Sequence, residues 1–260
     1  MTWHLGTMGF GYKQWSGAFY PPDLRPGDYL THYARHFDAV ELDTTFHAVP
    51  PGERFRRWAE VTPAGFRFSV KTPRAVTHDV PPDRSIPAML DFLGLARALG
   101  EKLGVVLIQY PPHFEADQFD RLATFLAALP ADGRFAVELR NRTWGSRRTL
   151  DLLCEHRCCL VAAEYLSRPG RVYVTTDFLY LRLIGEHGRF PKQDREQIDV
   201  GESLAWWKEG VAAVAPDVTT AWGFFNNDFA GYAVGTCNRF KGMLGLPVVE
   251  PPEIPGGLFG

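Results

Sequence analysis

The chain has 260 residues, with 28 Lys or Arg against 30 Asp or Glu and a formal net charge of −2 at pH 7. A charge this close to zero excludes a chain whose bulk field attracts nucleic acid or an anionic membrane, so any anion site has to be local. The start MTWHLGTMG has no basic region followed by an apolar core, and no window reaches about 18 apolar residues, so we expect no leader and no membrane segment. The four cysteines form no C-x-x-C pair, which favours a reduced, cytoplasmic protein.

Short apolar runs alternate with longer amphipathic runs along the whole chain, a pattern typical of βα-repeating proteins. The predicted strands cover residues 3–7, 39–45, 67–72, 104–110, 134–140, 160–165, 178–184 and 220–226. Helix-like segments connect them except at 167–177, after the sixth strand. Eight strands in about 250 residues predict a single α/β domain, a (β/α)8 barrel of parallel strands that is irregular between strands six and seven.

The chain offers no internal division into two domains, because no linker, charge run or repeat interrupts it. A doubly wound open sheet fits six strands better than eight, and no G-x-G-x-x-G motif opens a helix after the first strand. We therefore predict one barrel domain over residues 1–245, followed by a proline-rich carboxyl-terminal tail over 246–260.

The segment GTMGFGYKQWSGAFYPP, residues 6–22, follows the first predicted strand and should form the first loop at the carboxyl-terminal mouth of the barrel. Two interpretations of its aromatic residues stay open. Tyr12 and Trp15 are candidate substrate contacts in a wall on which a base or sugar ring stacks. Alternatively, they form the loop's own small core together with Phe19 and Tyr20.

Strand alternation predicts the residues that face the lumen, because successive side chains point to opposite faces and catalytic groups gather at the carboxyl ends of barrel strands. The polar residues that this alternation turns inward are Glu41, Asp43, Thr45, Arg67, Ser69, Lys71, Gln109, Glu138, Arg140, Glu164, Tyr180 and Arg182. The eighth strand ends in Asn226, Asn227 and Asp228.

So many polar groups in one lumen form either a hydrated pocket or a closed ion-pair network, since burying an unpaired charge is unfavourable. We favour the pocket, because barrel interiors are normally filled with branched apolar side chains. Arg140 and Arg182 are candidate anion contacts, and Lys71 adds a third cation. Glu41 and Glu138 are the candidate general acid and base, and Lys71 is grouped with them as catalytic.

Further candidate substrate-binding residues follow the predicted strands: Trp144, His78, Asn226, Asn227 and Asp228. The histidines show no H-E-x-x-H or H-x-H arrangement, so we expect no metal and no cofactor, and nothing supports a divalent metal. His32 and His36 are expected on the solvated face of the first helix. The segment 141–148 alone mixes basic and aromatic residues, but a solvated loop is favoured there, so the nucleic-acid signal is weak.

Six segments together resemble the YecE-like family, domain of unknown function 72. They are GTMGFGYKQWSGAFYP (6–21), VELDTTFHAVP (40–50), FRFSVKTPRAVTH (66–78), VELRNRTW (137–144), YLRLIG (180–185) and FFNNDFAGYAV (224–234). The resemblance covers nearly the whole chain and implies a TIM-barrel-like fold. It implies no reaction, because the family has no established activity.

The matching positions include Gly6, Glu41, Thr45, Phe46, Lys71, Thr77, His78, Glu138, Arg140, Trp144, Arg182, Asn226, Asn227 and Asp228. Two positions depart from the family pattern. Met8 stands where a small hydroxyl residue is expected, and Ile184 where many members carry a histidine before Gly185. We expect His187 to lie near enough to substitute for that histidine.

Three functions fit these residues. The first is an enzyme that acts on a phosphate-bearing small molecule or nucleotide by general acid/base chemistry, with phosphoester hydrolysis foremost. The second is a glycoside hydrolase that uses Glu41, Glu138 and Trp144. The third is a protein that binds a small anion without turnover. The oligomeric state is not predicted.

Overall fold

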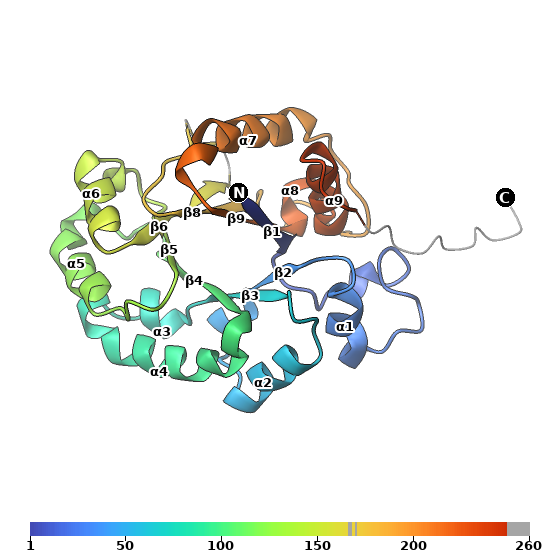
Figure 1. The fold of residues 1–260 in the computed structure, drawn as a ribbon, viewed down its shortest axis with the longest axis horizontal. Coiled ribbons are helices and arrows are strands. Elements are labelled where there is room, and N and C mark those ends of the chain that lie inside the picture. The colour runs from blue at the N-terminus through green and yellow to red at the C-terminus, as the bar shows by residue number, and fades with distance from the viewer. Residues whose placement is uncertain (166–167, 170, 249–260) are drawn as a thin grey trace, which may run out of the picture.

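The computed structural model describes residues 1–165, 168–169 and 171–248. In this range parallel strands form a central barrel and helices surround it, as Figure 1 shows in a view along the barrel. The strands are β1 (Thr2–Thr7), β2 (Ala39–Leu42), β3 (Arg67–Lys71), β4 (Leu103–Gln109), β5 (Phe135–Glu138), β6 (Cys158–Leu160), β7 (Ala162–Glu164), β8 (Phe178–Leu183) and β9 (Thr220–Phe225). The prediction of a parallel α/β barrel is confirmed.

The barrel consists of two hydrogen-bonded sheets, with strand orders β1-β9-β8-β7 and β2-β3-β4-β5-β6. Between β1 and β2 the wall is closed where the Gly9 N–H donates to the Glu41 carbonyl at 2.7 Å. Gly6 makes the close approach of these strands possible, because a Cβ at this position would lie 1.9 Å from the Ala39 carbonyl oxygen.

The sixth stave of the barrel is split into β6 and β7 at Val161. Its first half pairs with β5, with Cys159 opposite Ala136, and its second half pairs with β8, with Ala163 opposite Arg182. The predicted irregularity therefore lies where one stave changes partners. In the described part of the following link, no helix precedes β8, as expected.

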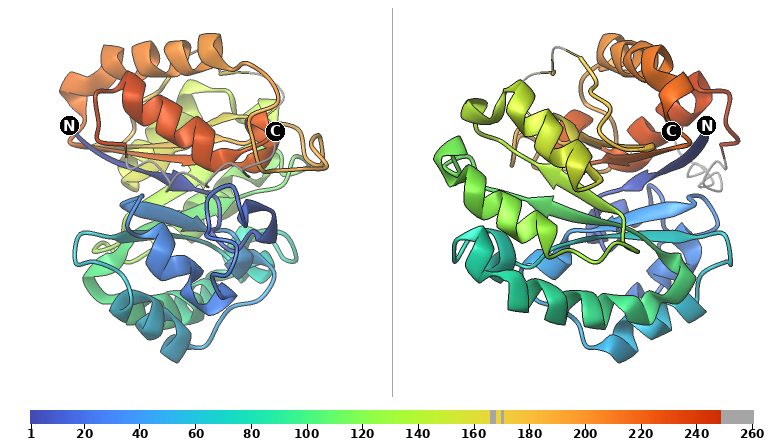
Figure 2. Two further views of the ribbon diagram at one scale, coloured as in Figure 1. Left: turned by 90° about the vertical axis from the view of Figure 1, so that its right-hand side faces the viewer. Right: turned by 60° about the vertical axis from the view of Figure 1, so that its left-hand side comes forward.

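The helices lie around the outside of the barrel, as Figures 1 and 2 show. They pack an apolar stripe against the strands. In α5, Leu122, Phe125 and Leu126 are buried at i, i+3 and i+4. The helices are α1 (Tyr29–Tyr33), α2 (Gly52–Glu60), α3 (Arg74–Thr77), α4 (Ile86–Ala96), α5 (Phe119–Ala127), α6 (Arg147–Glu155), α7 (Gly201–Val214), α8 (Asn227–Ala230) and α9 (Ala233–Met243). The short helices α3 and α8 begin just after β3 and β9, so they lie at the mouth.

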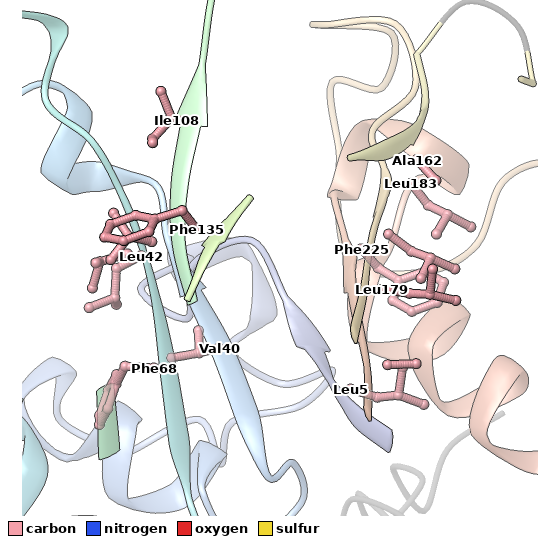
Figure 3. Packing of buried hydrophobic residues seen from close by; sticks show 14 of the residues in the cluster. Leu5, Val40, Leu42, Phe68, Ile108, Phe135, Ala162, Leu179, Leu183 and Phe225 are labelled. Atoms are coloured by element: carbon pink, nitrogen blue, oxygen red, sulfur yellow. The ribbon is translucent and has the colours of Figure 1, made fainter. Parts of the chain in front are cut away.

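Apolar side chains form two clusters, one between the strands and the helices and one inside the barrel lumen. Figure 3 shows part of the outer cluster, with Val40 and Phe68 on one side of the barrel and Leu179 and Leu183 on the other. The inner cluster fills the lumen and consists of Met8, Ala39, Val105, Leu107, Ala136, Cys159, Val161, Phe178, Tyr180, Ile184, Trp222 and Phe224. Below the charged layer at the mouth, the barrel interior is thus a packed core rather than a pore.

The prediction that Glu164 faces the lumen is wrong. Ala162 belongs to the outer cluster and lies beside Leu183 in Figure 3, so Glu164, two residues on, also points outward. Its Oε2 accepts hydrogen bonds from Ser203 Oγ at 2.6 Å and Trp207 Nε1 at 2.7 Å, both on α7. This carboxylate holds a helix against the barrel.

The described elements from β1 to α9 belong to the barrel, and residues 246–248 follow α9 after a turn at residues 244–245. Leu246 packs against the outer cluster. Most of the predicted proline-rich tail, residues 249–260, lies outside the described residues. The division of the chain at residue 245 therefore stays a prediction.

Candidate functional site

Arg182 is the centre of a buried charged layer at the carboxyl ends of the strands. Its Nε and Nη2 donate to the two oxygens of Glu41 at 3.0 and 2.8 Å, and its Nη1 donates to Glu138 Oε2 at 2.6 Å. Nη2 also lies 3.5 Å from the Met8 sulfur. Burial alone lowers the pKa of Arg182, but Glu41 and Glu138 outweigh burial and raise it far above its usual range. We predicted a substrate contact for this guanidinium, but its side chain is 4% exposed and its donors are engaged within the protein.

Glu41 and Glu138 belong to the same network. Tyr180 Oη donates to Glu41 Oε2 at 2.8 Å and lies 2.5 Å from Ser69 Oγ. Glu138 Oε1 accepts from Arg140 Nε at 2.5 Å. Burial raises the pKa of Glu138, but the Arg182 and Arg140 guanidiniums overcome burial and lower it to about 2. Glu138 is therefore a permanent carboxylate at neutral pH.

Lys71, the last residue of β3, lies at the open side of this layer. It is half-buried, and its Nζ lies 4.1 Å from the centroid of the Phe46 ring. Within the described residues, Nζ makes no hydrogen bond and no ion pair within 4.0 Å. Burial and the nearby Arg182 lower the pKa of Lys71 to about 8, so this amine titrates close to neutrality.

Asp43 was placed in the lumen by strand alternation but was not among the candidate site residues. It is half-buried just after β2, and desolvation followed by the charge of Glu41 raises its pKa. Tyr12 lies nearby, because Asp43, Asp228 and Glu41 all raise the pKa of its hydroxyl, after burial as the largest cause. Asp43 is identified as a candidate site residue by its raised pKa, close to Lys71 with its lowered pKa. Both shifts depend on how deeply the side chains are buried, which the sequence does not reveal.

Two predicted contacts are half-buried on the accessible side of the layer. Arg140 uses Nε for Glu138, and its guanidinium lies 5.3 Å from the Tyr165 ring. Tyr12 donates its hydroxyl to the Met8 carbonyl at 2.6 Å. With Lys71 and Asp43, these residues define the accessible rim, a name used below for Tyr12, Asp43, Lys71 and Arg140.

His78 connects the rim to a neighbouring cavity. Its ring lies 4.8 Å from the Phe46 ring, and its Nδ1 lies 2.8 Å from Thr77 Oγ1. Burial, then Lys71 and Arg74, lower the pKa of His78 to about 4, so the imidazole is neutral at physiological pH. The cavity has a volume of about 380 Å³ and is lined by His78, Pro81, Pro111, His113, Phe114 and Glu115, among others.

The residues after β9 have structural partners. Asn227 is 1% exposed, and its Oδ1 accepts hydrogen bonds from Trp15 Nε1 at 3.1 Å and from the Ala233 backbone N–H at 3.0 Å. We predicted Asn227 as a substrate contact, but the structure buries it as a link between the first loop and α9. Asn226 caps α8 by accepting from the Asp228 N–H at 2.9 Å. Asp228 Oδ2 lies 3.2 Å from His187 Nδ1.

The expected substitution of His187 for a lumen histidine is not seen. Its side chain is 93% exposed, whereas Ile184 is buried in the inner cluster. The other departure from the family pattern is Met8, at a position where a small hydroxyl residue is expected. The Met8 sulfur lies 3.6 Å from Asn226 Nδ2 and also near Arg182, so it can act as a weak hydrogen-bond acceptor in place of a hydroxyl.

Both tryptophans predicted to contact substrate are buried instead. Trp15 is fully buried and packs edge-on against Phe19, so the first loop's aromatics form its own core. Trp144 is 4% exposed, stacks on Phe114 at 5.1 Å and donates to its carbonyl at 2.8 Å. His36, expected on a solvated face, is 7% exposed and packs against Phe19.

Two further properties of the described residues bear on metals and membranes. No group of three or more His, Cys, Asp or Glu is placed to hold a metal ion. No described helix combines the length and apolar character that crossing a bilayer requires.

A closed barrel of parallel strands, with surrounding helices and charged groups at the carboxyl ends of the strands, defines the TIM-barrel class. The chain belongs to the family described as "Protein of unknown function DUF72", whose model matches residues 4–256. The predicted family is therefore confirmed.

Curated relatives and solved structures agree. The chain is 34% identical over 132 residues to UPF0759 protein YecE of Escherichia coli K12 (50% of this chain, 47% of YecE). It is 30% identical over 151 residues to UPF0759 protein YunF of Bacillus subtilis (55% of this chain, 52% of YunF). The matches thus span about half the length of these curated relatives.

Among solved structures, a DUF72 family protein of Thermotoga maritima superposes with a TM-score of 0.78 at 27% identity, covering 94% of this chain and 100% of that one. A DUF72 family protein of Enterococcus faecalis gives a TM-score of 0.74 at 22% identity, covering 95% and 98%. The second likeness bears on the fold alone.

Proposed function

We propose that this chain is an enzyme that acts on a small anionic molecule at the accessible rim, with phosphoester hydrolysis as the reaction to test first. The observation that carries the proposal is Lys71, a half-buried amine without a charge partner within 4.0 Å among the described residues, next to a network that neutralises itself.

The charge balance of the site supports an anionic ligand. Glu41 and Glu138 are matched by Arg182 and Arg140 through direct ion pairs. Lys71 adds a positive charge at the rim. Asp43 lies on the same rim, but no ion pair within 4.0 Å joins the two residues, so the Lys71 ammonium can still be neutralised by a phosphate. A ligand with two negative charges can make a second charged contact, with the partly exposed Arg140 guanidinium.

Proton transfer requires groups whose pKa values lie near the working pH, and two rim residues approach this condition. The pKa of Lys71 is lowered to about 8 and that of Asp43 is raised. We assign Lys71 as the acid that protonates the leaving oxygen and Asp43 as the base that takes a proton from water. Glu138, with a pKa of about 2, then positions Arg140 and Arg182 instead of moving protons.

The experiment is a hydrolysis screen on sugar phosphates, nucleotides and neutral glycosides, with and without divalent metals. Lys71→Met and Asp43→Asn should each lower the rate on a phosphate substrate about 10²–10⁴-fold. The exposed Lys208→Met serves as the matched control. Wild-type rates in Lys71→Met would overturn the assignment.

The screen also separates the two alternatives. A glycosidase needs two free carboxyl groups, whereas Glu41 and Glu138 bind the same guanidinium. A rate on glycosides alone would favour that function. Phosphate-dependent thermal protection without turnover would favour an anion-binding protein.

A further inference from the structure

We propose that Lys71 is a covalent nucleophile that forms an imine with the carbonyl carbon of an anionic aldehyde or ketone. The proposal rests on the anionic substrate site of the proposed function. It goes beyond that function because phosphoester hydrolysis needs no covalent bond to the amine.

The Lys71 amine makes no hydrogen bond within the described residues, unlike two other lysines that pack against the protein. Lys102 Nζ donates to the carbonyls of Ala59 and Thr62 at 2.5 and 2.6 Å. Lys241 Nζ donates to the His36 carbonyl at 3.1 Å. Within the described part of the chain, Lys71 Nζ makes no hydrogen bond and no ion pair within 4.0 Å, and it lies 4.1 Å from the centroid of the Phe46 ring. Among the described residues, no hydrogen bond or ion pair of Lys71 has to be broken before the Nζ lone pair attacks a carbonyl.

The electrostatic surroundings of Lys71 favour its neutral form. A lysine becomes a nucleophile at neutral pH when it is desolvated or lies next to another cation, because both favour the neutral amine. Lys71 meets both conditions, since it is half-buried at the end of β3 and is destabilised as a cation by Arg182 and Arg140. Glu41 and Glu138 act in the opposite direction, but their oxygens are already bonded to the two guanidiniums.

Arg140 offers a binding site for an anionic group on the substrate. Within the described residues, Arg140 uses only Nε in hydrogen bonding, so its terminal nitrogens remain for a carboxylate or phosphate. Such a group binds a guanidinium through two parallel hydrogen bonds. A carbonyl compound with an anionic group is therefore held with its carbonyl free to reach Lys71.

The chemistry balances without an oxidant or reductant. The neutral Nζ lone pair forms the N–C bond, and the carbonyl π pair moves to oxygen. A proton passes from nitrogen to that oxygen, which gives a neutral carbinolamine. The proton that the Lys71 ammonium gives up is held by Asp43, so the two residues exchange the roles that hydrolysis gives them. Asp43 then protonates the carbinolamine hydroxyl, the C–O bond breaks, and water leaves an iminium on Lys71. Water returns through the same steps in reverse, releasing the substrate.

The test is borohydride trapping on the native full chain, read by intact mass and peptide mapping. The probes are glyceraldehyde 3-phosphate, glyceraldehyde and glyoxylate. We expect one reduced adduct on Lys71, formed at roughly tenfold lower concentration of the phosphorylated aldehyde than of glyceraldehyde, from one charge-assisted contact. Lys71→Arg should lose this adduct, whereas Lys208→Met should keep it.

The proposal fails if none of the three probes modifies Lys71. It also fails if the adducts spread evenly over Lys71 and the exposed Lys13, Lys192 and Lys208. Arg140→Met separates the anion contact from the nucleophile, since it should remove the preference for the phosphorylated probe while the Lys71 adduct persists. Because trapping needs no turnover, an adduct with no phosphatase rate would reject hydrolysis and retain the imine, and the reverse result would reject the imine alone.

Discussion

Arg182 and Glu41 form a two-point ion pair inside the barrel, with Nε–Oε2 and Nη2–Oε1 distances of 3.0 and 2.8 Å and side chains 4% and 0% exposed. From sequence we expect an open pocket at these residues rather than a closed network. In the structure the inner layer is a closed network, and only the rim is accessible. The pair therefore belongs to the closed part of the barrel mouth, and the rim residues are the ones that a ligand can reach.

Glu138→Gln should lower the thermal midpoint strongly. Both oxygens of Glu138 accept from guanidiniums, so the amide leaves Arg182 and Arg140 incompletely neutralised in a buried site. Removing one partner of a buried ion pair typically costs about 3–5 kcal/mol, or on the order of 10 °C in a chain of this size. The exposed Glu155→Gln is the control. An unchanged midpoint in Glu138→Gln would contradict a structural role.

The same variant gives a pH dependence with a defined sign. The pKa of Glu138 is lowered from 4.5 to about 2 on folding, so its stabilising contribution is present above pH 4.5 and disappears as the pH falls toward 2. The midpoint difference between wild type and Glu138→Gln should therefore shrink from pH 5 downward. A constant difference between pH 7 and pH 3 would argue against this ion pair.

Lys71→Met should stabilise the protein at pH 7. Because the pKa of Lys71 falls from 10.5 to about 8 on folding, the folded state binds fewer protons than the unfolded state between these values, and wild-type stability rises across this interval. The variant has no ammonium to bury, so we expect its free energy of unfolding to exceed that of wild type by about 1–3 kcal/mol at pH 7. This difference should vanish near pH 10.5. Urea melts at several pH values measure it, and a destabilised variant at pH 7 would contradict the burial of an unpaired amine.

Trp15→Phe should reduce stability without changing anion binding. The substitution removes the hydrogen bond to Asn227 Oδ1 and part of a fully buried ring, at a cost of about 1–3 kcal/mol. The shift of the melting midpoint caused by phosphate should match that of wild type. Loss of that shift would restore Trp15 as a ligand contact.

Gly185→Ala and Gly188→Ala form a matched pair at the mouth. Both glycines have positive φ, 74° and 75°, so alanine costs about 1–2 kcal/mol in backbone strain at either position. Only at Gly185 does the added Cβ meet another backbone, 2.1 Å from the Asp228 carbonyl oxygen. Denaturant melts should show a distinctly larger loss for Gly185→Ala, and equal losses would contradict the close contact.

The fold follows from the sequence because hydrophobic alternation marks most strands clearly. In β2 and β3, Val40, Leu42, Phe68 and Val70 contrast with polar neighbours and all lie in the outer cluster. The sixth stave has no such contrast, since LVAAEY alternates small apolar residues. In the structure Cys159, Val161 and Ala163 face the inner cluster, and Leu160 and Ala162 face the outer one, so alternation continues through the change of partner. The sequence of this stave does not reveal which of the two alternating sets faces inward.

The candidate site was harder to predict because residue type does not reveal desolvation. Alternation turned both Asp43 and Glu138 inward, but only the structure tells which carboxylate is bonded by guanidiniums and which has a raised pKa. Trp15 and Trp144 show the same limit for aromatic loops. Sequence places both at the mouth, and packing turns both into the core.

The network also joins the two sheets, because Arg182 lies on β8 in one sheet, whereas Glu41 and Glu138 lie on β2 and β5 in the other. These charges lose their water favourably only when both sheets have come together, because an unpaired buried charge is unfavourable. We therefore expect the network to form late in folding, after the transition state. A chevron plot of Glu138→Gln should show a faster unfolding limb and a nearly unchanged refolding limb, so that this charged layer controls how long the barrel stays closed and not how fast it assembles.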